Sequence, residues 1–462
     1  MRRGTRVAEG RTVRAPLVIG SAVSALALVA AVVAVGCGED ASASADVDAG
    51  GGDEPQNDGL DDGGAAPDGG SIDATDASQT LIPTKIRYVL VLVKENHTFD
   101  NYFTGFPGAT SATTAKLSTG ATIARPVAPS GPLPQDICHA NSCGVMAYRG
   151  GAMNGFDLVG AGQLPFVHYT EQQIPNYWHY ARNFVLADHL FSTTLGPSTP
   201  GHMVFWNAQS RVLDNAHCQK DGGACSGFGC TAGADVKITT YEPDTCTTST
   251  AAPCFDVPTL VDHLPSGFTW ADYGGPLAAM TKSVTSAPGY AAHFHKQADL
   301  VADLTAGKVE NLMIAHLWSG DVSEHPTANP CAGENFSVDI INAAMMTPTW
   351  SEMAIVVTWD DWGGFYDHVA PPVKTCANGK VLQNGFRLPA IIISPYAKKG
   401  FVLSAPTEQA SIPRLVEELW GMSFMSTRDP HARDGDAGSL MGAFDFSQSP
   451  RAPLVLQKRA CP

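Results

Sequence analysis

The chain is poor in charged residues and especially in basic ones. Only 16% of its 462 residues are charged, whereas 44% are hydrophobic. This composition excludes an intrinsically disordered protein, because disordered chains carry too few apolar side chains to build a core. The 29 Lys and Arg residues are outnumbered by 45 Asp and Glu residues, which gives a net charge of −16. Nucleic acid is therefore not expected as a partner, since its phosphates bind to Lys and Arg.

Long apolar runs are missing after residue 36. The one run of bilayer length covers residues 17–36 and follows five arginines. Its last three residues are small, and Cys37 comes directly after them. We predict that residues 1–37 are a signal peptide with a lipobox, in which Cys37 is lipidated, or an N-terminal anchor that stays uncleaved. Both alternatives predict an exported protein of the cell envelope, held at the membrane through its N-terminus and most simply a lipoprotein.

Basic residues are entirely absent from residues 38–80. This stretch holds twelve acidic residues among Gly, Ala and Ser, so it has little to bury and its charges repel one another. We predict a disordered acidic linker. Residues 81–462 contain neither a fixed-period repeat nor a second stretch of this kind, which favours one large domain.

No two cysteines are separated by exactly two intervening residues, the spacing of many zinc sites. Besides Cys37 there are ten cysteines, an even number that fits up to five disulfides in an oxidising compartment. Half of them fall within residues 218–254, which we interpret as a disulfide-rich surface insertion. These five are Cys218, Cys225, Cys230, Cys246 and Cys254.

Short apolar runs rich in β-branched residues predict the strands of the fold. Near-continuous apolar runs are typical of strands that are covered on both faces. Helical patterns lie between them, at residues 174–187 and 412–420. The pattern predicts an α/β fold with a mostly parallel central sheet covered by helices on both faces. The predicted strands are residues 86–93, 268–273, 312–317, 353–358 and 389–393.

Oxygen-bearing side chains follow two of these strands. Glu95 and Asn96 come after the first strand, and Asp360 and Asp361 come after the strand at 353–358. In parallel sheets, sites form at the carboxyl ends of the strands. Adjacent carboxylates repel unless a proton or cation separates them, and carboxylate and amide oxygens suit a divalent cation. Both aspartates reach one ion only if the backbone turns, which the glycines at 363–364 permit.

Each segment also has a simpler interpretation. The residues after the first strand fit a helix start capped by Thr98 or Asp100, and the two aspartates fit a solvated turn.

A third segment, GPSTPGH at residues 196–202, holds a hydroxyl pair between Gly and Pro. A hydroxyl fixed near a metal ion is what covalent phosphoryl transfer needs, although an ordinary proline-rich turn has the same composition.

Taken together, these segments resemble the bacterial phosphoesterase family that includes phospholipases C and a class of acid phosphatases, within the alkaline phosphatase superfamily. The resemblance covers residues 84–425. It rests on five segments in the family's order: ENHTFDNYF, GPSTPGH, SEHP, TWDDWGGFYDHVAPP and FRLPAIIISPYAKKGFV. One departure is Gly201, which stands where the family usually has Asn.

The resemblance implies roles for individual residues. Ser198 would be the nucleophile and also a metal ligand, with Thr199 as the alternative nucleophile. His325 would contact the phosphoryl group or the leaving oxygen, and His139 resembles a second histidine of the site. The other implied metal ligands are Glu95, Asn96, Asp360 and Asp361. Three further histidines, His97, His202 and His368, are interpreted as hydrogen-bonded residues rather than as ligands or acid-base groups.

The expected activity is metal-dependent hydrolysis of phosphate esters through a serine nucleophile. Two substrate classes stay open, phosphomonoesters for an acid phosphatase and phospholipids for a phospholipase C. The metal is one or more divalent ions, with calcium, magnesium, manganese, zinc and iron as the alternatives. A hypothesis of another class is a non-catalytic surface lipoprotein that binds a ligand or partner.

Overall fold

A computed structural model describes residues 84–462, except 210, 219–226, 243–244, 276–277, 288 and 377–380. The chain divides into two units, residues 1–77 and 78–462, and all described residues belong to the second. The predicted signal or anchor segment with Cys37, the predicted linker and Cys225 lie outside the described residues. Within the described ranges, no helix has the length and apolar character needed to cross a bilayer.

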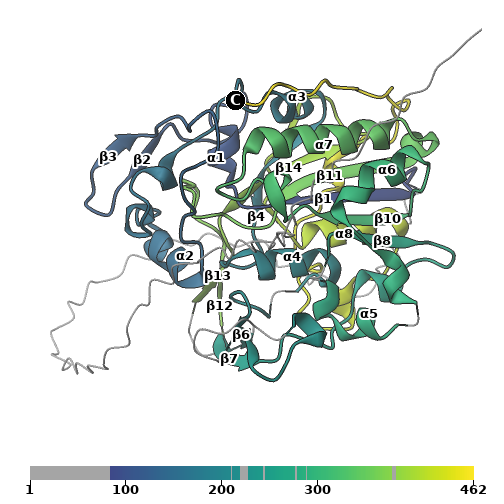
Figure 1. The fold of residues 1–462 in the computed structure, drawn as a ribbon, viewed down its shortest axis with the longest axis horizontal. Coiled ribbons are helices and arrows are strands. Elements are labelled where there is room, and N and C mark those ends of the chain that lie inside the picture. The colour runs from purple at the N-terminus through teal and green to yellow at the C-terminus, as the bar shows by residue number, and fades with distance from the viewer. Residues whose placement is uncertain are drawn as a thin grey trace, which may run out of the picture. The chain divides into compact units, whose positions relative to one another are not determined.

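A nine-stranded sheet forms the centre of the domain (Figure 1). Its order is β15-β4-β14-β11-β1-β10-β8-β9, and β16 also pairs with β4. Neighbouring strands run parallel, apart from β14, which is antiparallel to both β11 and β4. The predicted α/β fold with a mostly parallel sheet is confirmed. The strands are β1 (Tyr88–Lys94), β4 (Val185–Phe191), β8 (Trp270–Tyr273), β9 (Phe294–His295), β10 (Leu312–His316), β11 (Met353–Trp359), β14 (Arg387–Ile393), β15 (Phe401–Leu403) and β16 (Thr407–Glu408).

Helices cover both faces of this sheet. On one face, the Nζ atom of Lys94 in β1 donates a hydrogen bond to the carbonyl of Gly333 in α7, over 3.2 Å. On the other face, His316 of β10, whose register partner in β1 is Val93, contacts His202 of α4. Burial of the strands on both sides explains why β1, β11 and β14 read as continuous apolar runs. The helices are α1 (Phe99–Phe103), α2 (Asn141–Tyr148), α3 (Pro175–Asn183), α4 (Ser198–Asn207), α5 (Lys282–Ser286), α6 (Leu300–Thr305), α7 (Pro330–Met345) and α8 (Ser411–Trp420).

One predicted helix is too long. The pattern at 174–187 predicts a single helix, but α3 ends at Asn183 and Phe184 leaves the helical region with φ −129° and ψ −143°. Residues 185–187 instead begin β4, which pairs with β14 and β15. Pairing in the sheet overrides the local helical pattern here. The helix predicted at 412–420 is confirmed as α8.

The cysteine-rich insertion contains regular structure. It forms an antiparallel three-stranded sheet of β5 (His217–Cys218), β6 (Val236–Glu242) and β7 (Thr247–Ala251). A disulfide joins Cys230 to Cys254, whereas Cys246 pairs with Cys376 outside the insertion. Two more disulfides lie elsewhere, Cys138–Cys143 and Cys331–Cys461. Two separate hairpins complete the strands, β2 (Thr114–Lys116) with β3 (Thr122–Ala124) and β12 (Val373–Thr375) with β13 (Val381–Gln383).

Candidate active site

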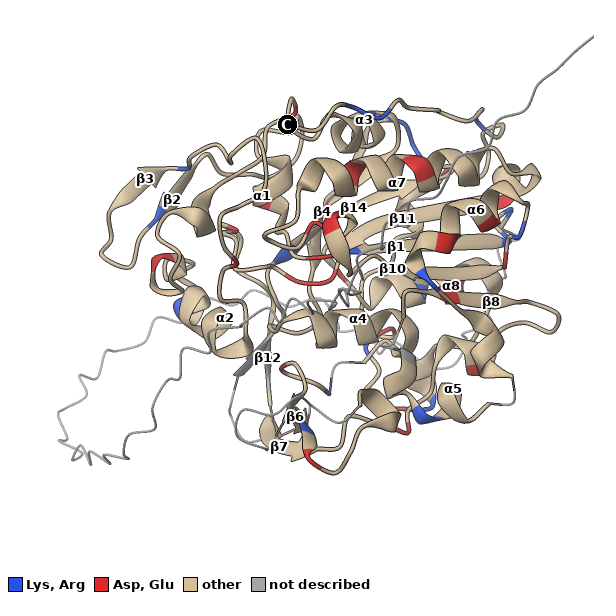
Figure 2. Cartoon of the chain, in the orientation of Figure 1, with Lys and Arg blue, Asp and Glu red and all other residues tan. Residues whose placement is uncertain are grey.

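The carboxyl ends of β1 and β11 bring four predicted ligands together. The two strands are parallel neighbours in the register Lys94↔Trp359, so the residues after them lie side by side. The backbone N–H of Asn96 donates to Oδ1 of Asp360 over 2.8 Å. Glu95, Asn96, Asp360 and Asp361 are each at most 4% exposed. In Figure 2, the ribbon positions of Asp and Glu occur in the centre of the domain as well as at its periphery, and Glu95, Asp360 and Asp361 are among the buried ones.

A glycine turn after β11 allows both aspartates to reach the same space. Gly363 has φ +58°, and its N–H donates to Oδ1 of Asp361 over 2.6 Å. A Cβ atom at this position would lie 2.4 Å from the Cβ of Asn96. The turn therefore needs glycine for its conformation and for the close approach of the two strand ends.

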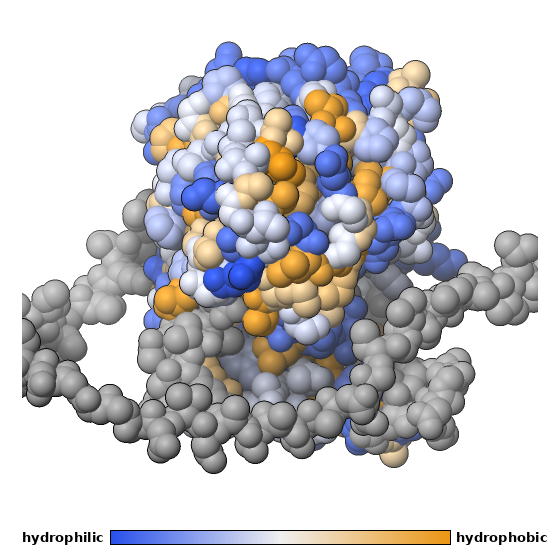
Figure 3. Space-filling view, turned by 90° about the vertical axis from the view of Figure 1, so that its left-hand side faces the viewer, coloured by the Kyte–Doolittle hydropathy of each residue, from blue (hydrophilic) through white to orange (hydrophobic). Residues whose placement is uncertain are grey.

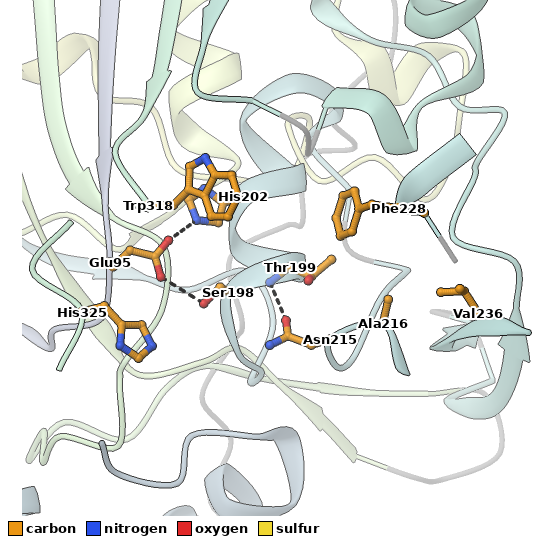
Figure 4. A pocket seen from close by; sticks show the side chains of 11 residues that line it. Glu95, Ser198, Thr199, His202, Asn215, Ala216, Phe228, Val236, Trp318 and His325 are labelled. Atoms are coloured by element: carbon orange, nitrogen blue, oxygen red, sulfur yellow. Dashed lines mark hydrogen bonds and ion pairs between the residues drawn. The ribbon is translucent and has the colours of Figure 1, made fainter. Parts of the chain in front are cut away.

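Ser198 is the first residue of α4 and faces the carboxylate of Glu95 (Figure 4). Its Oγ atom lies 3.3 Å from Oε2 of Glu95 and 3.2 Å from Oδ2 of Asp361. Thr199 lines the same cavity, and its backbone N–H donates to Asn215 Oδ1 over 2.9 Å. These contacts place the Ser198 hydroxyl directly beside two of the predicted ligands.

His202 lies within this site and contacts two of its carboxylates. Its Nε2 atom lies 2.7 Å from Oε1 of Glu95 and 3.3 Å from Oδ2 of Asp360. It is hydrogen-bonded, as expected, but its partners are two predicted metal ligands. A signal was present, because residues 198 and 202 are four apart and share one face of a helix.

His325 and His139 lie together at the edge of the site, with ring centroids 5.6 Å apart. Each ring has Nδ1 hydrogen-bonded to a backbone carbonyl, that of Pro326 for His325 and that of Ile137 for His139. A carbonyl only accepts, so Nδ1 carries the proton and Nε2 remains for another partner. His325 and Ser198 line the same cavity.

The other two histidines of this group, His97 and His368, form hydrogen bonds with neighbouring side chains. His97 is buried, with Nδ1 2.6 Å from Oδ1 of Asn101 and its ring stacked on Tyr102. Nδ1 of His368 lies 2.6 Å from Oδ2 of Asp100. The other carboxylate oxygen of Asp100 pairs with the buried Arg387. The guanidinium of Arg387 balances the negative charge of Asp100.

The carboxylates of the site perturb one another. Burial, followed by repulsion from Asp360, raises the pKa of Glu95, and burial with both neighbouring carboxylates raises the pKa of Asp361 far above its ordinary value. Burial opposes ionisation of Asp360 as well, but the hydrogen bond and charge of His202 together with hydrogen bonds from Asn96 and Ser198 outweigh it, so the pKa of Asp360 is lowered. Three buried carboxylates beside one imidazole favour an additional positive charge.

The side chain of Asn96 indicates where a cation fits. Its Oδ1 and Nδ2 atoms are buried and have no hydrogen-bond partner among the described residues. Buried amides are normally hydrogen-bonded, so this amide oxygen is available as a ligand. Together with the carboxylates of Glu95, Asp360 and Asp361 it forms an oxygen donor set that suits a divalent cation. The side chains present therefore fit the expected metal.

A cavity of about 590 Å³ opens beside Ser198. Its polar wall contains Glu95, Ser198, His202 and His325 (Figure 4). The rest of the lining includes apolar side chains, namely Ala216, Phe228, Val236 and Trp318. The site thus combines a charged end with an apolar wall.

The chain belongs to the Phosphoesterase family, whose sequence model matches residues 86–423. This confirms the resemblance seen in the sequence motifs. The chain is 31% identical over 175 residues to non-specific phospholipase C1 of Arabidopsis thaliana, a match that covers 32% of each chain. It is 23% identical over 435 residues to phospholipase C B of Mycobacterium tuberculosis, which covers 79% of each chain.

The matches differ in how much of each relative they span. Those to four Arabidopsis phospholipases C cover between 26% and 51% of the relatives' length. Among solved structures, the chain is similar to a protein in the alkaline phosphatase superfamily from Vibrio parahaemolyticus. That structure is 12% identical, with a TM-score of 0.31, over 75% of this chain and 72% of that one.

Proposed function

We propose that the protein is a metal-dependent phosphodiesterase of the phospholipase C type, with Ser198 as its nucleophile. The observation that carries the proposal is the position of the Ser198 hydroxyl, which lies within 3.3 Å of two buried carboxylates at the end of a partly apolar cavity. Membership of the Phosphoesterase family and relatives named phospholipase C support it. A pure binding module has no need of a hydroxyl in this position.

The metal would be held by Glu95, Asn96, Asp360 and Asp361 beside Ser198. When bound, it supplies positive charge that makes the hydroxyl more acidic and balances the charge of the phosphoryl oxygens. The Ser198 oxygen forms a bond to phosphorus while the bond to the leaving alcohol breaks. The serine then carries the rest of the diester, phosphorylcholine for a choline lipid, and water hydrolyses this serine ester and restores the hydroxyl.

His325 would serve as the acid for the leaving oxygen. Its ring is fixed through Nδ1 by the carbonyl of Pro326, so Nε2 is the atom that can hold the transferred proton. His139 lies beside it, with its ring similarly fixed, and would contact a phosphoryl oxygen. Both proposed roles are compatible with the ring orientations of His325 and His139 in the structure.

Apolar groups near the site favour a lipid substrate over a small phosphomonoester. Phe228 and Val236 form part of the cavity wall, and Trp318 lines the cavity while remaining 43% exposed. In α2, which begins two residues after His139, Val145 and Met146 are 51% and 41% exposed. Figure 3, seen from the side on which α2, β2 and β3 lie in Figure 1, shows apolar groups among hydrophilic ones. A lipid brings an apolar portion that such surfaces can contact.

The test compares phosphodiester and phosphomonoester hydrolysis. The substrates are p-nitrophenylphosphorylcholine, phosphatidylcholine vesicles and p-nitrophenyl phosphate, each with chelator or with one of the five candidate metals. We expect faster turnover of the diesters, loss of turnover with chelator and its return with metal. Ser198→Ala should abolish turnover, whereas Thr199→Val, the matched hydroxyl control, should retain it. Preference for the monoester would contradict the phospholipase assignment, and no turnover with any metal would contradict the enzyme.

A further inference from the structure

A series of buried side chains, linked by hydrogen bonds, leads from the interior of the domain to Glu95. The indole Nε1 of Trp206 lies 3.3 Å from Nε2 of His316, and Nδ1 of His316 lies 2.8 Å from Nδ1 of His202. Nε2 of His202 in turn lies 2.7 Å from Oε1 of Glu95. Trp206, His316 and His202 are each at most 1% exposed, so water does not compete for these contacts.

When both imidazoles are neutral, the first donor sets the direction of every hydrogen bond in this series. An indole N–H can only donate, so Nε2 of His316 accepts. A neutral imidazole carries one proton, so His316 donates from Nδ1 and Nδ1 of His202 accepts. His202 therefore presents its N–H at Nε2, the atom that faces Glu95.

We infer that Trp206 and His316 are positioning residues, which hold His202 as a hydrogen-bond donor to Glu95. The inference rests on the proposed function, because Glu95 matters as a metal ligand. With Oε1 engaged by His202, Glu95 turns Oε2 toward the Ser198 hydroxyl, 3.3 Å away. Hydrogen bonds of this kind orient a ligand, and their loss typically weakens metal binding roughly 10- to 100-fold.

Asp272 of β8 provides a control within the same region. It is fully buried, and its Oδ2 atom lies 3.9 Å from Nε2 of His316, beyond hydrogen-bond range. Burial raises the pKa of Asp272 far above its ordinary value, against the opposing effects of His202 and of hydrogen bonds from Trp206 and Gly275. An Asn side chain keeps an oxygen that can accept from Trp206. Replacing Asp272 with this neutral amide of similar shape should leave the series to Glu95 unchanged.

The test measures metal binding without substrate, by calorimetric titration of the full chain with each of the five candidate ions. The ion that binds wild type most tightly is then used throughout. His316→Leu should weaken its binding roughly 10- to 100-fold. His316→Asn should restore most of the affinity, because the Asn amide N–H replaces the Nδ1 donor. Asp272→Asn should bind like wild type, and urea unfolding of each variant checks that it is folded.

A second pair of variants covers the case in which His316→Leu does not fold. Trp206→Phe removes the indole donor but keeps an aromatic ring, and should also weaken metal binding. Trp270→Phe is the matched control, because its ring contacts Trp206 at 5.5 Å and it is 7% exposed. It should bind the metal like wild type.

The outcomes separate the two claims. Wild-type affinity in folded His316→Leu or Trp206→Phe would overturn the inference alone, as would equal loss in His316→Leu and His316→Asn. If wild type binds none of the five ions, the proposed function fails, and the inference with it.

Discussion

At the scale of single residues, the site depends on close packing between α4 and the end of β11. Gly201 lies three residues after Ser198, and a Cβ atom there would be 2.1 Å from the carbonyl oxygen of Asp360. The family motif that this chain resembles usually has Asn at this position. In this chain α4 approaches the strand end more closely than any side chain would permit, and this approach sets the distance from Ser198 to the carboxylates.

Gly201→Ala should therefore impair both stability and turnover. Overpacking of this kind typically lowers the free energy of unfolding by about 1–3 kcal/mol. It should also displace Ser198 and lower kcat for the diester. Urea unfolding and kinetic assays measure the two effects. Gly131→Ala is the control, since a Cβ there meets no atom within 4 Å. Equal stability and kcat in both variants would contradict the account of this contact.

The sequence could predict which strand ends carry oxygen ligands, but not what lies behind them. Glu95 and Asp360 follow apolar runs, and parallel neighbours bring such positions to one edge of a sheet. His316 stands at the end of an apolar run as well, where nothing local indicates which face of the sheet it occupies. Its contact with His202 depends on how α4 packs on that face, which is a tertiary property.

At the scale of elements, strand positions could be predicted while directions and one helix boundary could not. The apolar run at 389–393 predicts a strand, and β14 is one, but it runs antiparallel to both neighbours. Apolar composition carries no information on strand direction. Likewise, residues 185–187 continue the helical pattern of α3 but pair within the sheet as the start of β4.

Helix α8 contains a glutamate that makes stability depend on pH. Glu417 is fully buried and accepts a hydrogen bond from the N–H of Met425 over 3.0 Å. Burial, together with the nearby carboxylate of Asp434, raises the pKa of Glu417 from 4.5 to about 9. The folded state therefore holds a proton that the unfolded state releases. Its contribution to stability is complete below pH 4.5 and is lost as pH rises to about 9.

Glu417→Gln should flatten this dependence. Between pH 5 and 9 the wild-type free energy of unfolding should fall by up to about 1.4 kcal/mol per pH unit from this group. The Gln variant should lose that part of the slope and be more stable than wild type near pH 9. Urea unfolding across this pH range measures both quantities. Glu418→Gln, which removes a partner of Arg414, should retain the wild-type slope. A wild-type slope in Glu417→Gln would show that Glu417 is ionised in the folded state.

At the scale of the whole molecule, disulfides join distant parts of the chain. Cys331 in α7 pairs with Cys461 near the C-terminus, and Cys246 of the insertion pairs with Cys376, each across 130 residues. The sequence could predict that cysteines pair, because their number is even, but not which ones do, because pairing follows from the packed fold. The export that the N-terminal segment indicates stays a prediction.

The central claim is that Ser198 attacks phosphorus. The most direct measurement is to mix the metal-loaded protein with p-nitrophenylphosphorylcholine, quench it in acid within one turnover, and locate covalent phosphate by peptide mass spectrometry. The account predicts a phosphorylcholine group on the peptide at Ser198, absent in Ser198→Ala and still present in Thr199→Val. Modification of Thr199, or rapid turnover by Ser198→Ala, would contradict it.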